Sequence, residues 1–147
     1  MGWEKIMSYF NDLTNLVIET LEAETQRPVG DGIAPRDPED MTESDYPYCV
    51  VYPSETTFRM MSGPFTDPQG DKGLFYGVVS VAYSREGCEL LAERVRSAMQ
   101  YEAFKDFEGV RILEVSVDEL GALDRTTEVR PPVFTIRDTF LFRTTES

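Results

Sequence analysis

Apolar side chains recur at helical spacing in two parts of the chain. In residues 3–25 they make one stripe at intervals of three and four, formed by Trp3, Ile6, Met7, Phe10, Leu13, Val17 and Leu21. This pattern predicts an amphipathic helix that ends before Pro28. A second stripe predicts a helix over residues 85–100, with its core positions at Cys88, Leu91, Val95 and Met99. Ser84 precedes this helix as a favourable N-cap.

Four further segments have the composition of strands, at about residues 48–53, 74–83, 110–117 and 132–144. The first is a continuous apolar run and the second is apolar on both faces, so we expect both to be largely covered. Runs of antiparallel strands with helices on one side are typical of an α+β fold. The pattern therefore predicts a two-layer α+β domain, with about four mostly antiparallel strands and two helices packed on one face of the sheet.

The connections between these elements are long and polar. Residues 28–47 hold four prolines and six acids against one arginine, which predicts an acidic connection without regular structure. Whether it packs on a neighbour or moves freely stays open. We expect residues 54–73 to project as a loop or hairpin, and residues 118–132 to form a long hairpin arm. At 147 residues, the chain is expected to be a single domain over 1–147.

One acid breaks the pattern of the last strand. Asp138 shares its face with four large apolar residues, Phe134, Ile136, Phe140 and Phe142. The other face carries Thr135, Arg137 and Thr139. Either Asp138 meets an arginine, or this end of the face is an interface rather than core. The arginine pair is the favoured interpretation, with Arg111 or a neighbour of Arg137 in the sheet as the candidate partner.

Charge and cysteine content narrow the class of protein. The chain has 27 acids against 14 bases and a net charge of -13, which disfavours nucleic acid as a direct ligand. Cys49 and Cys88 are too few for a disulfide framework, and we expect them to be free, buried thiols. The first residues lack the features of a signal peptide, and no apolar run approaches the roughly 20 residues of a membrane span. A cytosolic protein without a membrane contact is therefore expected.

Residues that could carry chemistry are sparse. The absence of histidine removes the commonest general base and metal ligand. Asp67 and Asp71 could approach a calcium ion, but their spacing is not that of an EF-hand. Gly30 and Gly32 lack the remaining features of a dinucleotide fingerprint. We therefore expect no catalytic residue, no metal and no cofactor, and an enzyme is disfavoured.

Large apolar residues gather instead in the segment that is expected to project. For any single one of them, a hairpin with one covered face is the simpler explanation, but together they favour a protein partner. With flanking charged residues and the second arm, the candidate interface residues are Phe58, Met60, Met61, Phe65, Asp67, Asp71, Lys72, Asp124, Arg125 and Arg130.

The succession of four sequence segments resembles a known family. These segments are YPYCVVYP, then SGPFTD, then YGVVSVAYSREGCELLAERVRSAM, then DRTTEVRPPVFTIRDTFLFRTT. Their order is similar to that in the tail terminator proteins of long-tailed (siphovirus-type) double-stranded DNA phages. The shared features are a strand of this kind, a loop with glycine and aspartate, a valine-rich strand that runs into a helix, and a Pro-Pro connection to a terminal strand. The resemblance covers roughly residues 1–145.

The resemblance implies a structural virion protein rather than an enzyme. It implies a hexameric ring that caps the tail tube, stops its polymerisation and forms the tail-side surface for head joining. The implied partners are the tail tube protein and a head-side neck or connector protein, and DNA would pass through the channel without specific binding. The implied location is the neck end of the tail in the virion, after assembly in the host cytoplasm.

Two other interpretations stay open from the sequence. Another neck protein, such as a head-completion or stopper protein, would share the ring and the acidic character. A small ligand-binding or enzymatic α+β domain belongs to a different class, and it would need a pocket with convergent polar groups. The mass of the particle in solution distinguishes a ring from such a domain, which would be a monomer.

Overall fold

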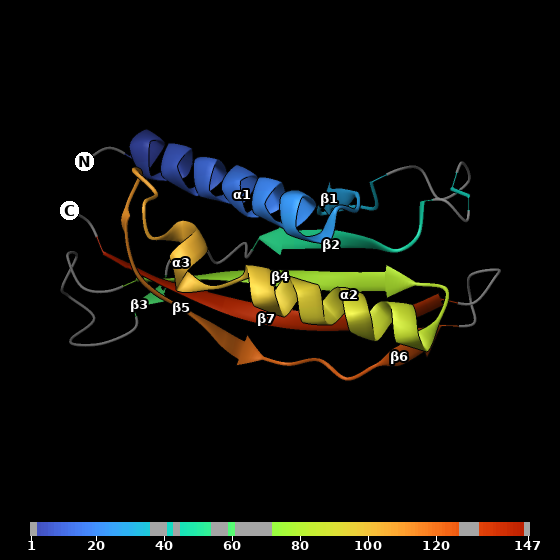
Figure 1. Cartoon of the computed structure of the whole chain (residues 1–147). Coiled ribbons are helices and arrows are strands. Elements are labelled where there is room, and N and C mark those ends of the chain that lie inside the picture. Colours follow the sequence, from blue (N-terminus) through green and yellow to red (C-terminus); the bar gives the residue numbers. More distant parts are fainter. Residues whose placement is uncertain are drawn as a thin grey trace.

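The computed structural model describes residues 3–35, 41–42, 45–53, 59–60, 72–126 and 133–145. These residues form a layer of helices beside a sheet (Figure 1). The helices are α1 (Trp3–Thr25), α2 (Arg85–Ala98) and the short α3 (Tyr101–Phe104). The strands are β1 (Val29–Asp31), β2 (Tyr48–Pro53), β3 (Arg59–Met60), β4 (Lys72–Ala82), β5 (Arg111–Glu119), β6 (Asp124–Thr126) and β7 (Val133–Thr145). The predicted α+β class is confirmed.

The described strands form one mixed sheet. Its order is β1-β2-β4-β7-β5, with β3 paired to β4 and β6 paired to β7. β1 runs parallel to β2, and the other pairs are antiparallel. The four expected strands are present as β2, β4, β5 and β7, but the three short strands make the sheet larger than predicted. Segments as short as Asp124–Thr126 have no strand pattern of their own, and they pair because a neighbouring strand offers its backbone.

The three described helices pack on the same face of the sheet. Their buried contact residues are Leu13, Val17 and Leu21 of α1, Leu91, Val95 and Ala98 of α2, and Phe104 of α3. On the sheet they meet side chains such as Tyr76 of β4 and Phe142 of β7. The Phe142 ring is met nearly edge-on by Tyr76, with centroids 5.2 Å apart, and by Phe104, at 4.9 Å. The main core therefore lies between the helices and this face.

The start of α2 follows from local chemistry. The Ser84 hydroxyl accepts a hydrogen bond from the Gly87 N–H at 3.0 Å, so the predicted N-cap is confirmed. Glu86 lies in the first turn and Arg96 in the last turn, where each charge suits the helix dipole. Because only Tyr83 and Ser84 separate β4 from α2, the helix returns directly over the sheet and packs on β4 and β7 (Figure 1).

The opposite face of the sheet, here called the far face, carries no described helix. In register across three strands it presents Tyr52 of β2, Gly77 of β4 and Thr139 of β7. One end of the far face is buried beneath the segment that follows β1. There Tyr48, Val50, Val81 and Val133 pack against Ala34, Met41 and Tyr46. Residues 48–51 are consequently buried on both sides, as their apolar run predicts.

The expectation that residues 28–47 lack regular structure is wrong for Val29–Asp31. These residues form β1, which pairs in parallel with residues 49–51. The chain then folds back closely over β1. A Cβ atom at Gly30 would lie only 1.9 Å from the Ile33 carbonyl oxygen, so this position needs glycine. Gly32 makes the return possible with a φ of +75°, a conformation that glycine adopts at little cost. Proline and acid content could not reveal this backbone pairing.

The two expected arms are partly integrated into the sheet. Residues 59–60 pair with residues 72–73 and form the base of a hairpin, whereas residues 54–58 and 61–71 lie outside the described residues. β5 extends to Glu119, and β6 pairs with the start of β7. Residues 118–126 of the expected second arm therefore follow the edge of the sheet rather than project from it. Residues 127–132 lie outside the described residues.

The buried ring of α3 provides a test of this packing. We expect Phe104→Ala to lower the free energy of unfolding by about 3–5 kcal/mol, because the ring is fully buried between Phe142 and the helices. Tyr101→Ala in the same helix is the matched control, since Tyr101 is largely exposed, and it should cost less than about 1 kcal/mol. Urea unfolding followed by circular dichroism measures both. Equal effects of the two changes would show that α3 does not belong to the core.

Candidate interaction surfaces

Asp138 joins three elements at one buried point. Its carboxylate is 1% exposed. The Arg96 guanidinium of α2 donates two hydrogen bonds, from Nε to Oδ2 at 2.9 Å and from Nη2 to Oδ1 at 2.9 Å. The Gly121 N–H, from the link between β5 and β6, donates a third at 2.9 Å. The prediction of an arginine pair is confirmed, but the partner is Arg96 of the covering helix rather than Arg111.

This arrangement holds the fold together and leaves the carboxylate no capacity for a ligand. The hydrogen bond to Asp138 raises the pKa of the Arg96 guanidinium above its ordinary value, so the guanidinium stays charged. Gly121 packs directly on β7. A Cβ atom at this position would lie 1.8 Å from the Arg137 carbonyl oxygen, so a larger residue would collide with the strand. The β5–β6 link is thus fixed against β7 by both a hydrogen bond and close backbone contact.

The outer edge of the sheet is formed by β5. Val117 within the strand is 46% exposed and Leu120 just after it is 56% exposed. The strand also carries the exposed acids Glu114, Asp118 and Glu119. Irregularities interrupt its pairing with β7 at two points, beside residues 113 and 118. Bulges and charges of this kind discourage pairing with the edge of another sheet. The edge is therefore a poor site for adding a strand, although its apolar side chains remain available for contact.

The far face holds an arginine in an ordered position. Arg137 is exposed on β7, and its guanidinium carbon lies 5.4 Å from the centroid of the Tyr52 ring on β2. Between these strands, Gly77 of β4 offers no side chain, and a Cβ atom there would lie 3.2 Å from Arg137 Nη2. The side chain of Arg137 thus extends over the bare backbone of β4 at Gly77, and its guanidinium lies beside the Tyr52 ring.

Tyrosines extend the covered end of the far face. The rings of Tyr46 and Tyr83 lie 4.1 Å apart, and those of Tyr46 and Tyr48 lie 5.2 Å apart. Burial is the main cause that raises the pKa of Tyr48 to about 12 and shifts the pKa of Tyr46 in the same direction. These phenols consequently stay neutral near pH 7, and they contribute apolar surface rather than charge.

The candidate residues named from the sequence do not form one patch. Met60 and Lys72 are register partners at the base of the β3–β4 hairpin, beside the end of β7. Asp124 and Arg125 are exposed on β6 at the start of β7, and the Arg125 guanidinium carbon lies 5.9 Å from the centroid of the Phe134 ring. Figure 1 shows β3 and β6 at opposite ends of the sheet. The other candidates, Phe58, Met61, Phe65, Asp67, Asp71 and Arg130, lie outside the described residues.

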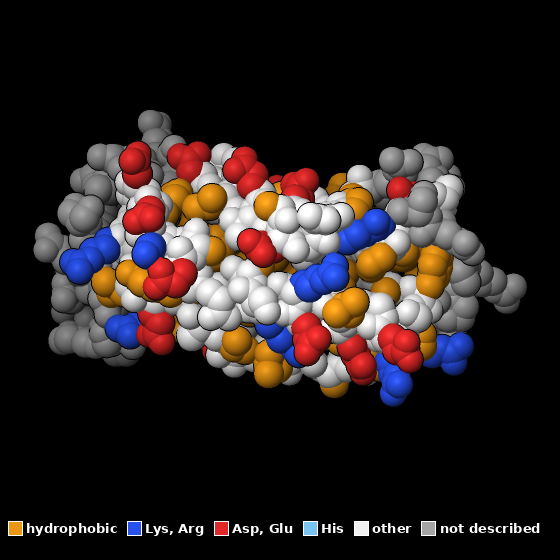
Figure 2. Space-filling view, viewed as in Figure 1, with side chains coloured by type: hydrophobic (Ala, Val, Ile, Leu, Met, Phe, Trp, Pro, Cys, Tyr) orange, Lys and Arg blue, Asp and Glu red, His pale blue; other side chains and the backbone are white. Residues whose placement is uncertain are grey.

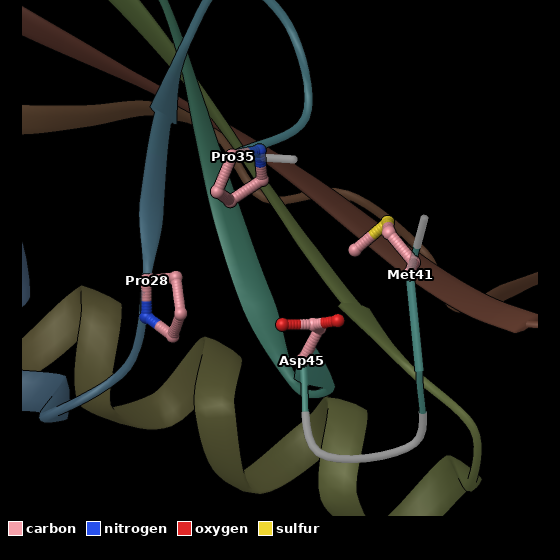
Figure 3. A pocket seen from close by; sticks show the side chains of 4 residues that line it. All are labelled: Pro28, Pro35, Met41 and Asp45. Carbon is pink, nitrogen blue, oxygen red and sulfur yellow. The ribbon is translucent and has the colours of Figure 1, made fainter. Parts of the chain in front are cut away.

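A small pocket lies beside β1 and β2. It has a volume of about 110 Å³ and is lined by Pro28, Pro35, Met41 and Asp45 (Figure 3). The Asp45 carboxylate already accepts a hydrogen bond from the Thr42 N–H at 2.8 Å. Ligand pockets typically measure roughly 300–1,000 Å³ and combine apolar walls with several convergent polar groups. This pocket is too small and too poor in polar groups to serve as such a site.

Three wider and more open hollows of about 420–530 Å³ lie on the surface of the described part, and one of them is lined by Glu89, Glu93 and Arg96. No group of three or more histidine, cysteine or acidic side chains among the described residues could hold a metal ion. Cys49 and Cys88 are free and buried, as the sequence predicts. Burial raises the pKa of the Cys49 thiol to about 12 and that of the Cys88 thiol to about 11. Within the same described part, no helix is long and apolar enough to cross a membrane.

No protein-family model matches the chain, and no curated protein matches it.

Sequence reasoning missed the combination of Arg137, Tyr52 and Gly77, although the alternation of the last strand did assign Arg137 to the face opposite Asp138. The missing information was the register that brings β2, β4 and β7 into line. The Arg137 surface and the two ends of the sheet are therefore the candidate interaction surfaces.

Replacing the buried acid tests its structural role. We expect Asp138→Asn to lower the free energy of unfolding by about 1–3 kcal/mol, because Arg96 loses its ionic partner and one of the three hydrogen bonds loses its acceptor. The control is Glu114→Gln, which breaks an exposed pair with Arg143 at 3.1 Å and should cost less than about 1 kcal/mol. Urea denaturation at pH 7 measures both changes. A loss at Asp138 no larger than at Glu114 would contradict the assignment.

The cysteines should be almost inert in the folded protein. A thiol pKa of 11 to 12 rather than the ordinary 9.0 lowers the reactive thiolate fraction at pH 8 by about a hundredfold or more, and burial adds a steric barrier. We expect labelling by a disulfide reagent at pH 8 to be at least that much slower in native protein than in urea. Rapid labelling of either native thiol would show that its segment opens readily.

Proposed function

We propose that this protein is a phage tail terminator, a subunit of a hexameric ring that caps the tail tube, stops its polymerisation and presents the tail-side surface for head joining. The observation that carries the proposal is the order of elements. A long helix comes first, then the strand β2 and the β3–β4 hairpin, and β4 passes into α2 after two residues. The long strand β7 ends the described chain. This is the succession on which the sequence resemblance is based.

The layering supports a subunit of a closed ring. A cyclic ring of identical subunits needs two different contact surfaces on each subunit, because each copy meets its two neighbours through different patches. The unlike layers of this chain support such an arrangement, since the helices cover one face of the sheet and the far face bears Tyr52 and Arg137. The absence of a metal cluster among the described residues and the small size of the pocket beside β2 give no support to an enzyme.

The separation of the candidate residues fits a protein that lies between two partners. Met60 and Lys72 lie at one end of the sheet, and Asp124 and Arg125 lie at the other. We assign these ends to the tail tube protein and to the head-side neck protein, without fixing which end meets which. The net charge of -13 favours a channel through which DNA passes without specific binding, because carboxylates repel phosphates.

The test is to measure assembly and its effect on the tube. Native mass spectrometry of the purified protein, alone and with the tail tube protein of the same phage, should reveal a species of six times 16.7 kDa. Tube protein that polymerises in the presence of this protein should give tubes that no longer elongate when more tube protein is added. A monomer under both conditions, together with unchanged tube growth, would refute the proposal.

A further inference from the structure

The guanidinium of Arg137 is held ready for a partner that the described residues do not supply. It lies over the bare backbone at Gly77, with its carbon 5.4 Å from the centroid of the Tyr52 ring. A cation–π contact of this kind uses none of the N–H groups of the exposed guanidinium, which stay able to donate hydrogen bonds. No described carboxylate forms an ion pair with Arg137, whereas Arg96 and Arg143 both have acidic partners.

An ordered, exposed arginine on an aromatic ring has the properties of an interface anchor. Arginine and tyrosine are enriched among the few residues that carry most of the energy of a protein interface. An arginine that is already positioned loses less side-chain entropy when it binds. Its natural ligand is a carboxylate, which it can hold through two parallel hydrogen bonds. The far face is therefore suited to an acidic protein surface.

Such a surface is present on the outer side of α1. The exposed acids Asp12, Glu19 and Glu22 lie at spacings of seven and three residues, so they share one side of the helix. The core residues Leu13, Val17 and Leu21 point the other way. From Phe10 to the end of α1 there is no lysine or arginine. Figure 2 shows acidic side chains gathered along this edge of the helix layer.

We propose that the Arg137–Tyr52 anchor of one copy docks on the acidic stripe of α1 in the next copy. The inference rests on the proposed function, because it names the surfaces by which the ring subunits meet. The two patches lie on different layers of the subunit, so the contact is heterologous and can repeat from copy to copy until a ring closes. Opposite charge at this contact also offsets the repulsion between copies that each carry a charge of -13.

Disulfide trapping tests the contact directly. The double variant carries one cysteine on each proposed surface. Thr139→Cys places a thiol beside Arg137 on the far face, and Asn15→Cys places one between Asp12 and Glu19 on the exposed side of α1. Neither change removes a charge, and the native thiols are buried, so they should not compete. Under mild oxidation we expect the double variant to give a ladder of cross-linked species beyond the dimer. Each single variant should give at most a trace of dimer.

Charge reversal makes the test specific. In the double-cysteine background, Arg137→Glu should reduce the ladder by about tenfold or more, and so should Glu19→Arg with Glu22→Arg. Combining the two reversals should restore the ladder. A ladder that persists with Arg137→Glu would overturn the inference. Efficient dimers from Thr139→Cys alone would also overturn it, because they would show that two far faces meet each other.

The failure of this contact is distinguishable from failure of the proposed function. If the unmodified protein forms the six-membered species but the double variant gives no ladder, the ring uses other surfaces, the inference is wrong and the proposed function stands. The same result without a six-membered species would count against both the inference and the proposed function. Circular dichroism of each variant checks that the fold is retained.

Discussion

A carboxylate that is buried among aromatic side chains must be paired, and the position of Asp138 therefore decides how three parts of this fold meet. Arg96 reaches it from α2, which fixes the helix over β7. The Gly121 N–H reaches it from the other side and draws the β5–β6 link against the same strand. Because any larger residue at position 121 would collide with the Arg137 backbone, the close approach and the hydrogen bond depend on each other.

The consequence of this arrangement is a domain with two unlike faces. Helices cover one face and present acids to the outside along α1, whereas the far face keeps a bare strip at Gly77 and an ordered arginine above it. Asp138 and Arg137 are adjacent in β7 but point to opposite faces, so one residue secures the core and the next remains available for contact. An asymmetry of this kind is what the proposed ring of identical subunits requires.

Much of the fold could be predicted from the sequence, because its main elements carry strong periodic patterns. The stripe of α1, the Ser84 cap and the apolar runs of β2 and β4 all depend on local spacing. β1 and β6 could not be predicted in this way, since Val29–Asp31 and Asp124–Thr126 pair only because a neighbouring strand is present. The partner of Asp138 was missed for a related reason, since Arg96 comes close only through the packing of α2 on the sheet.

The candidate site was predictable only in part. Composition drew attention to the apolar residues between 54 and 73, of which the described part of the chain includes Met60. The Arg137 anchor depends on register across three strands, which alternation within a single strand cannot supply. Tyr52, Gly77 and Arg137 become neighbours only through the pairing of β2, β4 and β7.

The position of this protein in an imaged phage particle tests the central claim most directly. A cryo-electron microscopy map of the tail, into which this subunit is fitted, should contain six copies in a ring at the head-proximal end of the tube. In that ring the far face of each copy should meet α1 of the next. Density for this chain elsewhere in the particle, or its absence from particles with normal tails, would contradict the account.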